Sequence, residues 1–198
     1  MGNITIDIVL LPDKKMTEKS IALNHQLKDR NDALVLSAEK GLPHITLVMG
    51  CISKDKLALI EKEVGKIAND LRKLRLRILE VDFDTNQDGT PNTGLEVENK
   101  QELQSLHEKI ANILKPYLLT AEIDSLYQDP VPDEITLSWV NNFLKKSSFK
   151  NYRPHITIGL GKLENIQLPI VFTVDKIAIC HLGNYCTCQK VIKEFNLR

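Results

Sequence analysis

The sequence has no excess of either charge. Its 198 residues include 26 Lys or Arg and 26 Asp or Glu, so the formal net charge at pH 7 is zero. A protein that holds long nucleic acid electrostatically carries a surplus of basic residues, because its affinity depends on cations that neutralise phosphates. A small or terminal nucleotide therefore fits this composition better than a duplex does.

Long apolar runs and export signals are also missing. No stretch approaches the roughly 20 apolar residues that cross a membrane, and the amino terminus has no basic segment followed by an apolar one. Gly2 begins a myristoylation pattern, but Ile6 stands where that pattern requires Ser or Thr. We expect a cytosolic protein that does not contact membranes.

Cysteine is scarce as well, with four in the chain. This number does not make a disulfide framework in a chain of this size and expected compartment. Cys180 and His181 adjoin on a predicted strand and point to opposite faces, and Cys186 and Cys188 lack the two-residue spacing of a zinc knuckle. We predict reduced, partly buried thiols and no metal site.

The sequence does contain one short motif twice. Residues 42–50 read LPHITLVMG and residues 153–161 read RPHITIGLG. Side chains alternate along a strand, so each histidine shares a face with the threonine two residues later, while the aliphatic residues face the other side. Each proline favours a strand that begins at the histidine, because proline cannot donate a ladder hydrogen bond.

The two motifs supply His44 with Thr46, and His155 with Thr157. One neutral imidazole can accept a proton from a nucleophile while one imidazolium donates to a leaving group, and a pKa near 6.5 suits both tasks. The threonine hydroxyls can donate to phosphate oxygens, where charge accumulates in the transition state. Two buried, satisfied histidines are the alternative, but a repeated exposed ionisable group favours an active site that needs no metal.

Two His-x-Thr motifs about half a chain apart, each followed by an aliphatic residue, resemble the two-histidine (2H) phosphoesterase superfamily. That superfamily includes the LigT-like RNA 2′,3′-cyclic phosphodiesterases, also called 2′-5′ RNA ligases. Residues 176–183 and 191–197 resemble its closing hairpin. The resemblance implies an α+β fold, with two antiparallel β-sheets around a central groove, helices outside and pseudo-twofold related lobes. We expect one bilobal domain over residues 1–198.

The resemblance also implies a reaction: hydrolysis of the 2′,3′-cyclic phosphate of an RNA end or a small nucleotide to a 2′-phosphate, without metal or cofactor. In the LigT-like branch the first histidine is the acid and the second activates water. His44 would then be the acid and His155 the base, with Thr46 and Thr157 on the phosphate; the sequence leaves the exchange of the two roles open. Arg153 is a further candidate phosphate ligand. We expect a monomer.

Three alternatives remain. Within the superfamily, the enzyme could cleave 2′-5′ linkages or trim RNA ends, with a ribose hydroxyl in place of water. In another class, the same groove could bind nucleotides without catalysis. Intact copies of both motifs weigh against that alternative, because binding alone does not need two proton carriers.

The rest of the chain predicts further elements from its apolar periodicity. His107 is expected at the edge of a buried helix face, and Tyr127 is a candidate for stacking on a base. The expected strands and helices are a strand at 3–11, helices at 14–29 and 53–69, strands at 72–85 and 94–98, helices at 100–117 and 133–147, and strands at 170–182 and 189–197.

Two stretches have more than one interpretation. The alternating basic residues of 73–77 fit a phosphate-binding groove, a solvated strand face or the protection of an edge strand. Residues 82–89 resemble the start of a calcium loop, but Leu95 stands where such a loop ends in Glu. A hairpin connection explains the same residues.

Overall fold

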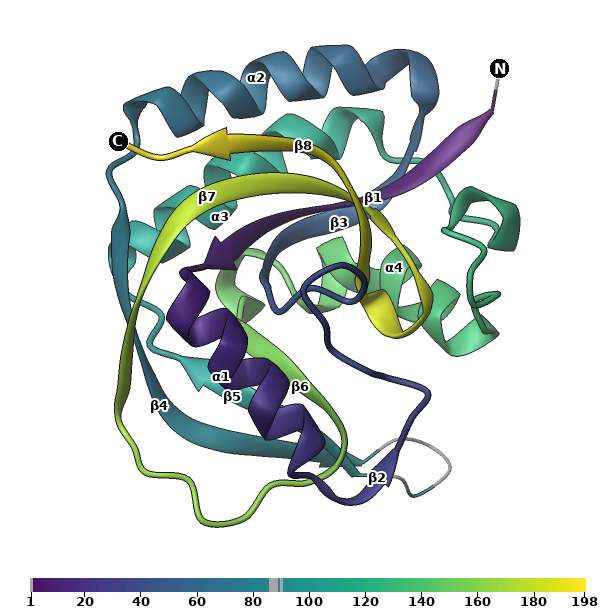
Figure 1. Cartoon of the computed structure of the whole chain (residues 1–198). Coiled ribbons are helices and arrows are strands. Elements are labelled where there is room, and N and C mark those ends of the chain that lie inside the picture. Colours follow the sequence, from purple (N-terminus) through teal and green to yellow (C-terminus); the bar gives the residue numbers. More distant parts are fainter. Residues whose placement is uncertain (1, 86–88, 90) are drawn as a thin grey trace.

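The computed structural model describes residues 2–85, 89 and 91–198 (Figure 1). The strands and helices of the described chain include every element expected above and one more strand, β2. In order they are β1 (Asn3–Pro12), α1 (Lys14–His25), β2 (Lys28–Asn31), β3 (Ile45–Ser53), α2 (Leu57–Asp70), β4 (Leu74–Thr85), β5 (Pro91–Val97), α3 (Gln101–Leu114), α4 (Glu134–Lys146), β6 (His155–Lys162), β7 (Ile170–Leu182) and β8 (Cys188–Asn196).

The strands form one antiparallel sheet with the order β2-β6-β5-β4-β7-β1-β3, and β8 pairs with β7. The long strand β7 joins two parts. Its residues 170–174 pair with β4, whereas its later residues pair with β1 and β8. We call β1, β3 and β8 the first lobe, and β2, β4, β5 and β6 the second lobe. The α+β class is confirmed, and the two expected sheets are continuous through β7.

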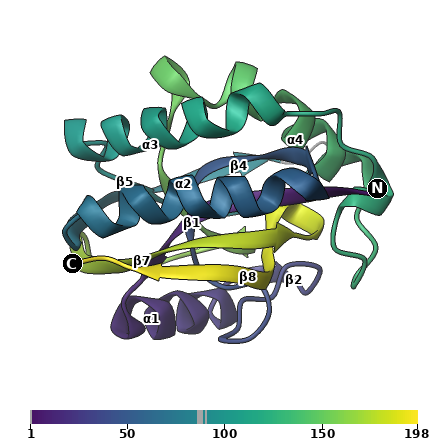
Figure 2. The same ribbon diagram turned by 90° about the horizontal axis from the view of Figure 1, so that it is seen from above.

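Helices cover both faces of this sheet (Figure 2). Helix α1 contacts β1, β6 and β7 on one face, and α2 contacts β7 and β8 on the other, beside α3. Helices α3 and α4 both pack against β3. The Asp13 carboxylate caps the start of α1 by accepting the Met16 N–H at 2.9 Å.

The two motif strands are anchored by their aliphatic residues. Ile45 and Leu47 of β3 and Ile156 and Ile158 of β6 are all fully buried. Burial of each such side chain contributes about 1.5–3 kcal/mol, so the opposite faces of these strands are held at fixed positions. One hydrophobic cluster includes residues of both lobes, which supports our proposal that the chain is a single bilobal domain.

Two local expectations were wrong. The helix expected to reach residue 29 ends at His25, and β2 then pairs with β6; its polar sequence, KDRN, shows no alternation from which a strand could be predicted. His107 is fully buried instead of lying at a boundary. Its Nδ1 donates to the Leu47 carbonyl at 2.6 Å, and its Nε2 accepts the Phe149 N–H at 2.7 Å.

The cysteine prediction was wrong for one pair. Cys180 and Cys188 form a disulfide, whereas Cys51 and Cys186 are free. The prediction used the cysteine count and the expected compartment, but the pairing follows from strand register. Antiparallel pairing of β7 with β8 brings the two Cα atoms within 5.5 Å, a separation typical of disulfides.

The two ambiguous stretches belong to β4 and its surroundings. Strand β4 lies between β5 and β7, so edge protection does not explain its basic residues. β4 and β5 pair antiparallel up to Thr85 and Pro91, as a hairpin connection predicts. The calcium alternative depends on residues 86–88 and 90, which lie outside the described residues.

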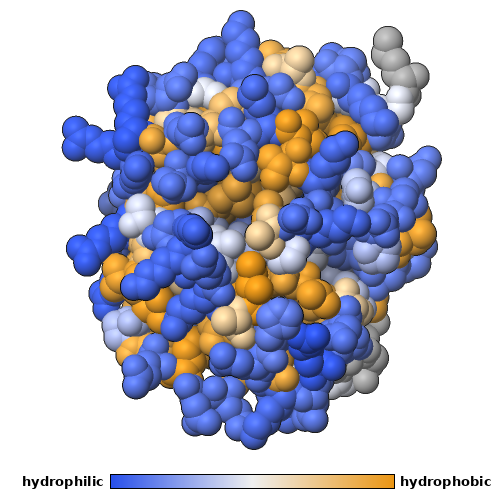
Figure 3. Space-filling model, in the orientation of Figure 1, coloured by the Kyte–Doolittle hydropathy of each residue, from blue (hydrophilic) through white to orange (hydrophobic). Residues whose placement is uncertain are grey.

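The surface drawn in Figure 3 is mostly hydrophilic, with apolar patches between the polar side chains. Among the described residues, no helix combines the length and apolar character needed to cross a membrane.

Candidate active site

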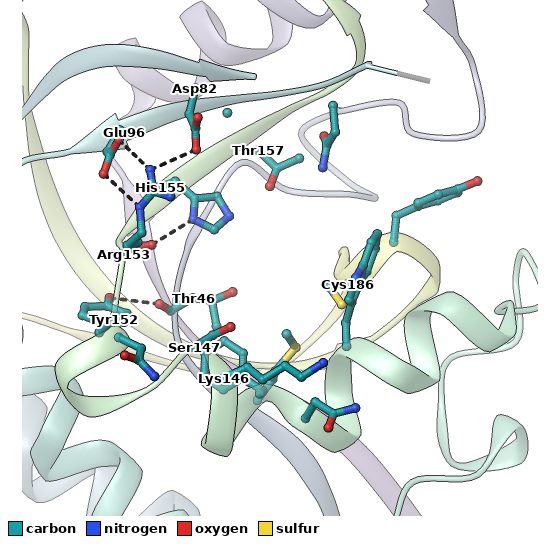
Figure 4. A pocket seen from close by; sticks show the side chains of 18 of the residues that line it. Thr46, Asp82, Glu96, Lys146, Ser147, Tyr152, Arg153, His155, Thr157 and Cys186 are labelled. Atoms are coloured by element: carbon teal, nitrogen blue, oxygen red, sulfur yellow. Dashed lines mark hydrogen bonds and ion pairs between the residues drawn. The ribbon is translucent and has the colours of Figure 1, made fainter. Parts of the chain in front are cut away.

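A pocket of about 430 Å³ is lined by both motif strands, the β4–β5 pair and α4 (Figure 4). From the strands it receives Thr46, Asp82, Glu96, His155 and Thr157. Its volume is in the range of small-molecule sites. Both copies of the repeated motif therefore reach the same pocket, although not with all their polar residues.

His155 is the exposed histidine of the pair. Its Nδ1 donates to the Arg153 carbonyl at 3.0 Å, so the neutral ring has its lone pair on Nε2. Thr157 follows on the same face, and no side-chain hydrogen bond is recorded for it within the described chain. This wall offers one proton-transfer group and one hydroxyl to a ligand (Figure 4).

His44 is placed differently. Its imidazole is only 11% exposed, and it is not among the described residues that line the pocket. Its Nδ1 donates to the Leu42 carbonyl at 2.6 Å, which leaves Nε2 to face the interior. The charge of a protonated His155 acts to lower the pKa of His44, but of the two histidines only His155 is among the described residues that line the pocket.

Asp7 is a candidate site residue that the sequence analysis missed. It lies on β1, fully buried, and its Oδ2 accepts the Thr46 hydroxyl at 2.7 Å. The same Oδ2 is 3.5 Å from His44 Nε2. Its Oδ1 has no hydrogen-bond partner in the described structure. The sequence does contain a signal for Asp7, namely a lone carboxylate between the apolar residues Ile6 and Ile8 of β1. A buried charge is costly without a specific partner, so such a residue indicates a specific role.

Burial shifts the pKa of both groups toward the neutral form. It lowers the pKa of His44 to about 4, and the nearby His155 acts in the same direction. It raises the pKa of Asp7 well above its ordinary value, against a smaller opposite effect of the Thr46 hydrogen bond. At neutral pH, His44 is therefore unprotonated and suited to accept a proton.

Arg153 lines the pocket but has carboxylate partners. Its guanidinium is 3.1 Å from both Asp82 and Glu96, and the pairing lowers the pKa of Glu96. Because the Arg153 carbonyl accepts the His155 ring N–H, these ion pairs help to fix the backbone that orients His155. A phosphate contact by Arg153 stays a prediction.

Two other candidates lie elsewhere. Tyr127 packs edge-on against His181, with ring centroids 5.5 Å apart, and does not line the pocket. The basic residues of 73–77 do not line it either, and Arg77 is 3.7 Å from Glu98, as expected of a solvated strand face. The pocket instead receives Trp139 and Lys146 from α4, which the sequence analysis did not select.

Several known proteins resemble this chain in family or fold. The family model described as 2′-5′ RNA ligase superfamily matches residues 25–184. No curated protein matches. Among solved structures, TT0787 of Thermus thermophilus is 14% identical with a TM-score of 0.57, and the match covers 98% of each chain. E. coli LigT in its apo form is 13% identical with a TM-score of 0.56, over 100% of this chain and 99% of that one.

E. coli LigT has also been solved in complex with 3′-AMP; that structure is 14% identical with a TM-score of 0.51, over 99% of each chain. At these identities the structural neighbours show a common fold. The family model covers most of the chain, including both His-x-Thr motifs. The chain therefore belongs to the 2′-5′ RNA ligase superfamily.

Proposed function

We propose that this protein is a metal-independent phosphodiesterase that hydrolyses the 2′,3′-cyclic phosphate of an RNA end or small nucleotide to a 2′-phosphate. Membership of the superfamily indicates an enzyme that acts on phosphodiester bonds. The observation that carries the proposal is the meeting of His155, Thr157 and Thr46 at one pocket, with His44 beside the same Asp7 oxygen that accepts the Thr46 hydroxyl.

The electrostatics favour one assignment of the two histidines. A pKa of about 4 leaves His44 neutral at pH 7, so we assign it as the base, and the exposed His155 as the acid that protonates the leaving 3′ oxygen. This exchanges the roles implied by the family resemblance. Asp7 Oδ2, 3.5 Å from His44 Nε2, is placed to stabilise the imidazolium that forms when His44 accepts a proton.

The hydroxyls of Thr46 and Thr157 also have different surroundings. Thr46 donates to Asp7, so it connects the buried His44–Asp7 pair to the pocket. Thr157 has no such partner in the described structure, which leaves its hydroxyl for a non-bridging phosphate oxygen. Arg153 would add a phosphate contact only by weakening its ion pairs.

The test is turnover of nucleoside 2′,3′-cyclic monophosphates, and of a short RNA with a 2′,3′-cyclic end, in EDTA. We expect a 2′-phosphate product, and a loss of at least about 100-fold in His44→Ala and in His155→Ala, the usual contribution of an acid or base. His25→Ala is the matched control, because His25 is exposed on α1 and does not line the pocket. Full activity of His155→Ala would refute the mechanism.

A second candidate is a non-catalytic nucleotide-binding protein, and the burial of His44 favours it. An imidazole that is 11% exposed and faces Asp7 is poorly accessible to a substrate. This candidate predicts that cyclic nucleotides bind without turnover, and that His44→Ala binds them as well as the wild type. The oligomeric state and the location in the cell stay predictions.

A further inference from the structure

Helix α4 presents one polar and aromatic face to the pocket. Ser138, Trp139, Asn142, Phe143 and Lys146 all line it, and their spacing places them on the same side of a helix. They belong to a different wall from that of His155 and Thr157; Figure 4 shows Lys146 and Ser147 across the pocket from those two residues. The reaction as proposed uses none of these α4 side chains.

Trp139 is unusual for its exposure. It is the only tryptophan of the chain, it lines the pocket, and 36% of its surface is exposed. A large aromatic ring is ordinarily covered, because its burial is strongly favourable. An exposed indole beside a phosphodiester-type site offers a flat surface on which a nucleobase can stack.

A second aromatic residue is fixed to the same helix. Tyr185 lines the pocket from the short η5 turn (Asn184–Cys186) between β7 and β8. Its backbone N–H donates to the Thr136 hydroxyl of α4 at 3.0 Å, and that hydroxyl donates to the Asn184 side chain at 2.7 Å. The turn and the helix therefore hold both aromatic residues at one pocket.

Lys146 supplies a cation at the end of this face. Of the described residues that line the pocket, Lys146 and Arg153 are the two Lys or Arg side chains. Arg153 is paired with Asp82 and Glu96, whereas Lys146 has no ion pair among the residues that the structure describes. Lys146 follows Trp139 by seven positions, so their Cα atoms lie about 10 Å apart along the helix, a span suited to a base and a neighbouring phosphodiester.

We propose that this face of α4 is an RNA-binding subsite, in which a base stacks on Trp139 and Lys146 binds the phosphodiester next to the cyclic end. The preferred substrate is then an RNA end of at least two nucleotides, and not a cyclic mononucleotide. The position of the cyclic phosphate in this inference rests on the proposed function, but binding to the subsite does not require turnover.

Because Trp139 is the only tryptophan, its fluorescence reports on the subsite directly. The probes are a diribonucleotide with a 2′-phosphate end and a nucleoside 2′-monophosphate, neither of which contains a cyclic phosphate. We expect both to quench the emission of the wild type. The Trp139 variants are tested by steady-state turnover of a short RNA. Trp139→Ala should raise KM about tenfold, as expected for the loss of one stacked base, with kcat little changed. Trp139→Phe should restore most of the wild-type KM.

Lys146→Ala separates the two probes. It should weaken binding of the diribonucleotide about threefold, as expected for the loss of one exposed ionic contact, and leave the affinity for the monophosphate unchanged. Lys145→Ala, the exposed neighbour on α4 outside the pocket, should change neither. Two results would overturn the subsite. One is turnover by an enzyme whose Trp139 emission neither probe quenches, and the other is an equal loss of affinity for both probes in Lys146→Ala. Quenching without any turnover would overturn the proposed reaction and leave the subsite standing.

Discussion

The Nε2 atom of His44 lies 3.5 Å from Oδ2 of Asp7. That Oδ2 also accepts the Thr46 hydroxyl, so one fully buried carboxylate contacts both polar residues of the first motif. Within the described residues, no buried carboxylate contacts both polar residues of the second motif; the exposed His155 ring donates to the Arg153 carbonyl instead. The two sequence copies are nearly identical, but their environments differ, and burial lowers the pKa of His44.

Asp7→Asn tests whether this contact serves catalysis. The amide keeps the shape of the side chain but cannot take on the negative charge that would stabilise a protonated His44, so we expect kcat to fall about 10- to 100-fold, with KM nearly unchanged. The measurement is steady-state kinetics across pH 5–9 on a cyclic nucleotide. Unchanged kcat and an unchanged pH profile would show that Asp7 has only a structural role.

The same variant should be more stable than the wild type at neutral pH. A carboxyl whose folded pKa is raised contributes stability below its unfolded pKa and loses it as pH rises toward the folded value. Asp7 therefore opposes folding at pH 7, and Asn removes that penalty. Chemical denaturation should show a higher unfolding free energy for Asp7→Asn. A destabilised variant would instead indicate that a charged Asp7–His44 pair supports the fold.

His44 changes the unfolding free energy with the opposite pH dependence to that of Asp7. Its folded pKa of about 4 lies below the ordinary value, so its contribution is complete above about pH 6.5 and is lost as pH falls toward 4, by about 3 kcal/mol for this shift. In the wild type, Asp7 partly offsets this loss. Denaturation at pH 6.5 and pH 4 should therefore show a steeper loss of stability in Asp7→Asn than in the wild type. Equal slopes would contradict the raised pKa of Asp7, and no loss in Asp7→Asn would contradict the lowered pKa of His44.

The strand alternation of the motifs was predictable from sequence, since period-two patterning needs no tertiary information. It placed Ile45 and Ile156 in the core and the threonines at one pocket. The burial of His44 was not predictable, because it depends on where β1 lies against β3 and on Asp7, far away in the sequence. The candidate base-stacking residue Tyr127 was chosen from a loop, where position relative to the pocket has no sequence signal.

Arg153→Ala distinguishes a phosphate ligand from a structural ion pair. Its guanidinium is engaged by Asp82 and Glu96, and exposed ion pairs of this kind contribute about 0–1 kcal/mol to stability. We expect a loss of less than about tenfold in kcat/KM, through a less well fixed His155. A rise in KM of about 100-fold with an unchanged kcat would instead show a direct phosphate contact, and Arg153→Lys is the charge-preserving control.

The Cys180–Cys188 disulfide predicts two free thiols, Cys51 and Cys186. Alkylation of the unfolded protein without reductant, followed by mass spectrometry, should modify these two alone. The Cys188 carbonyl accepts the Leu42 N–H at 3.2 Å, and the Leu42 carbonyl holds His44, so the disulfide anchors the segment that orients His44. Cys180→Ser should cost about 2 kcal/mol of stability and lower kcat; four alkylated thiols would show that the pair is reduced.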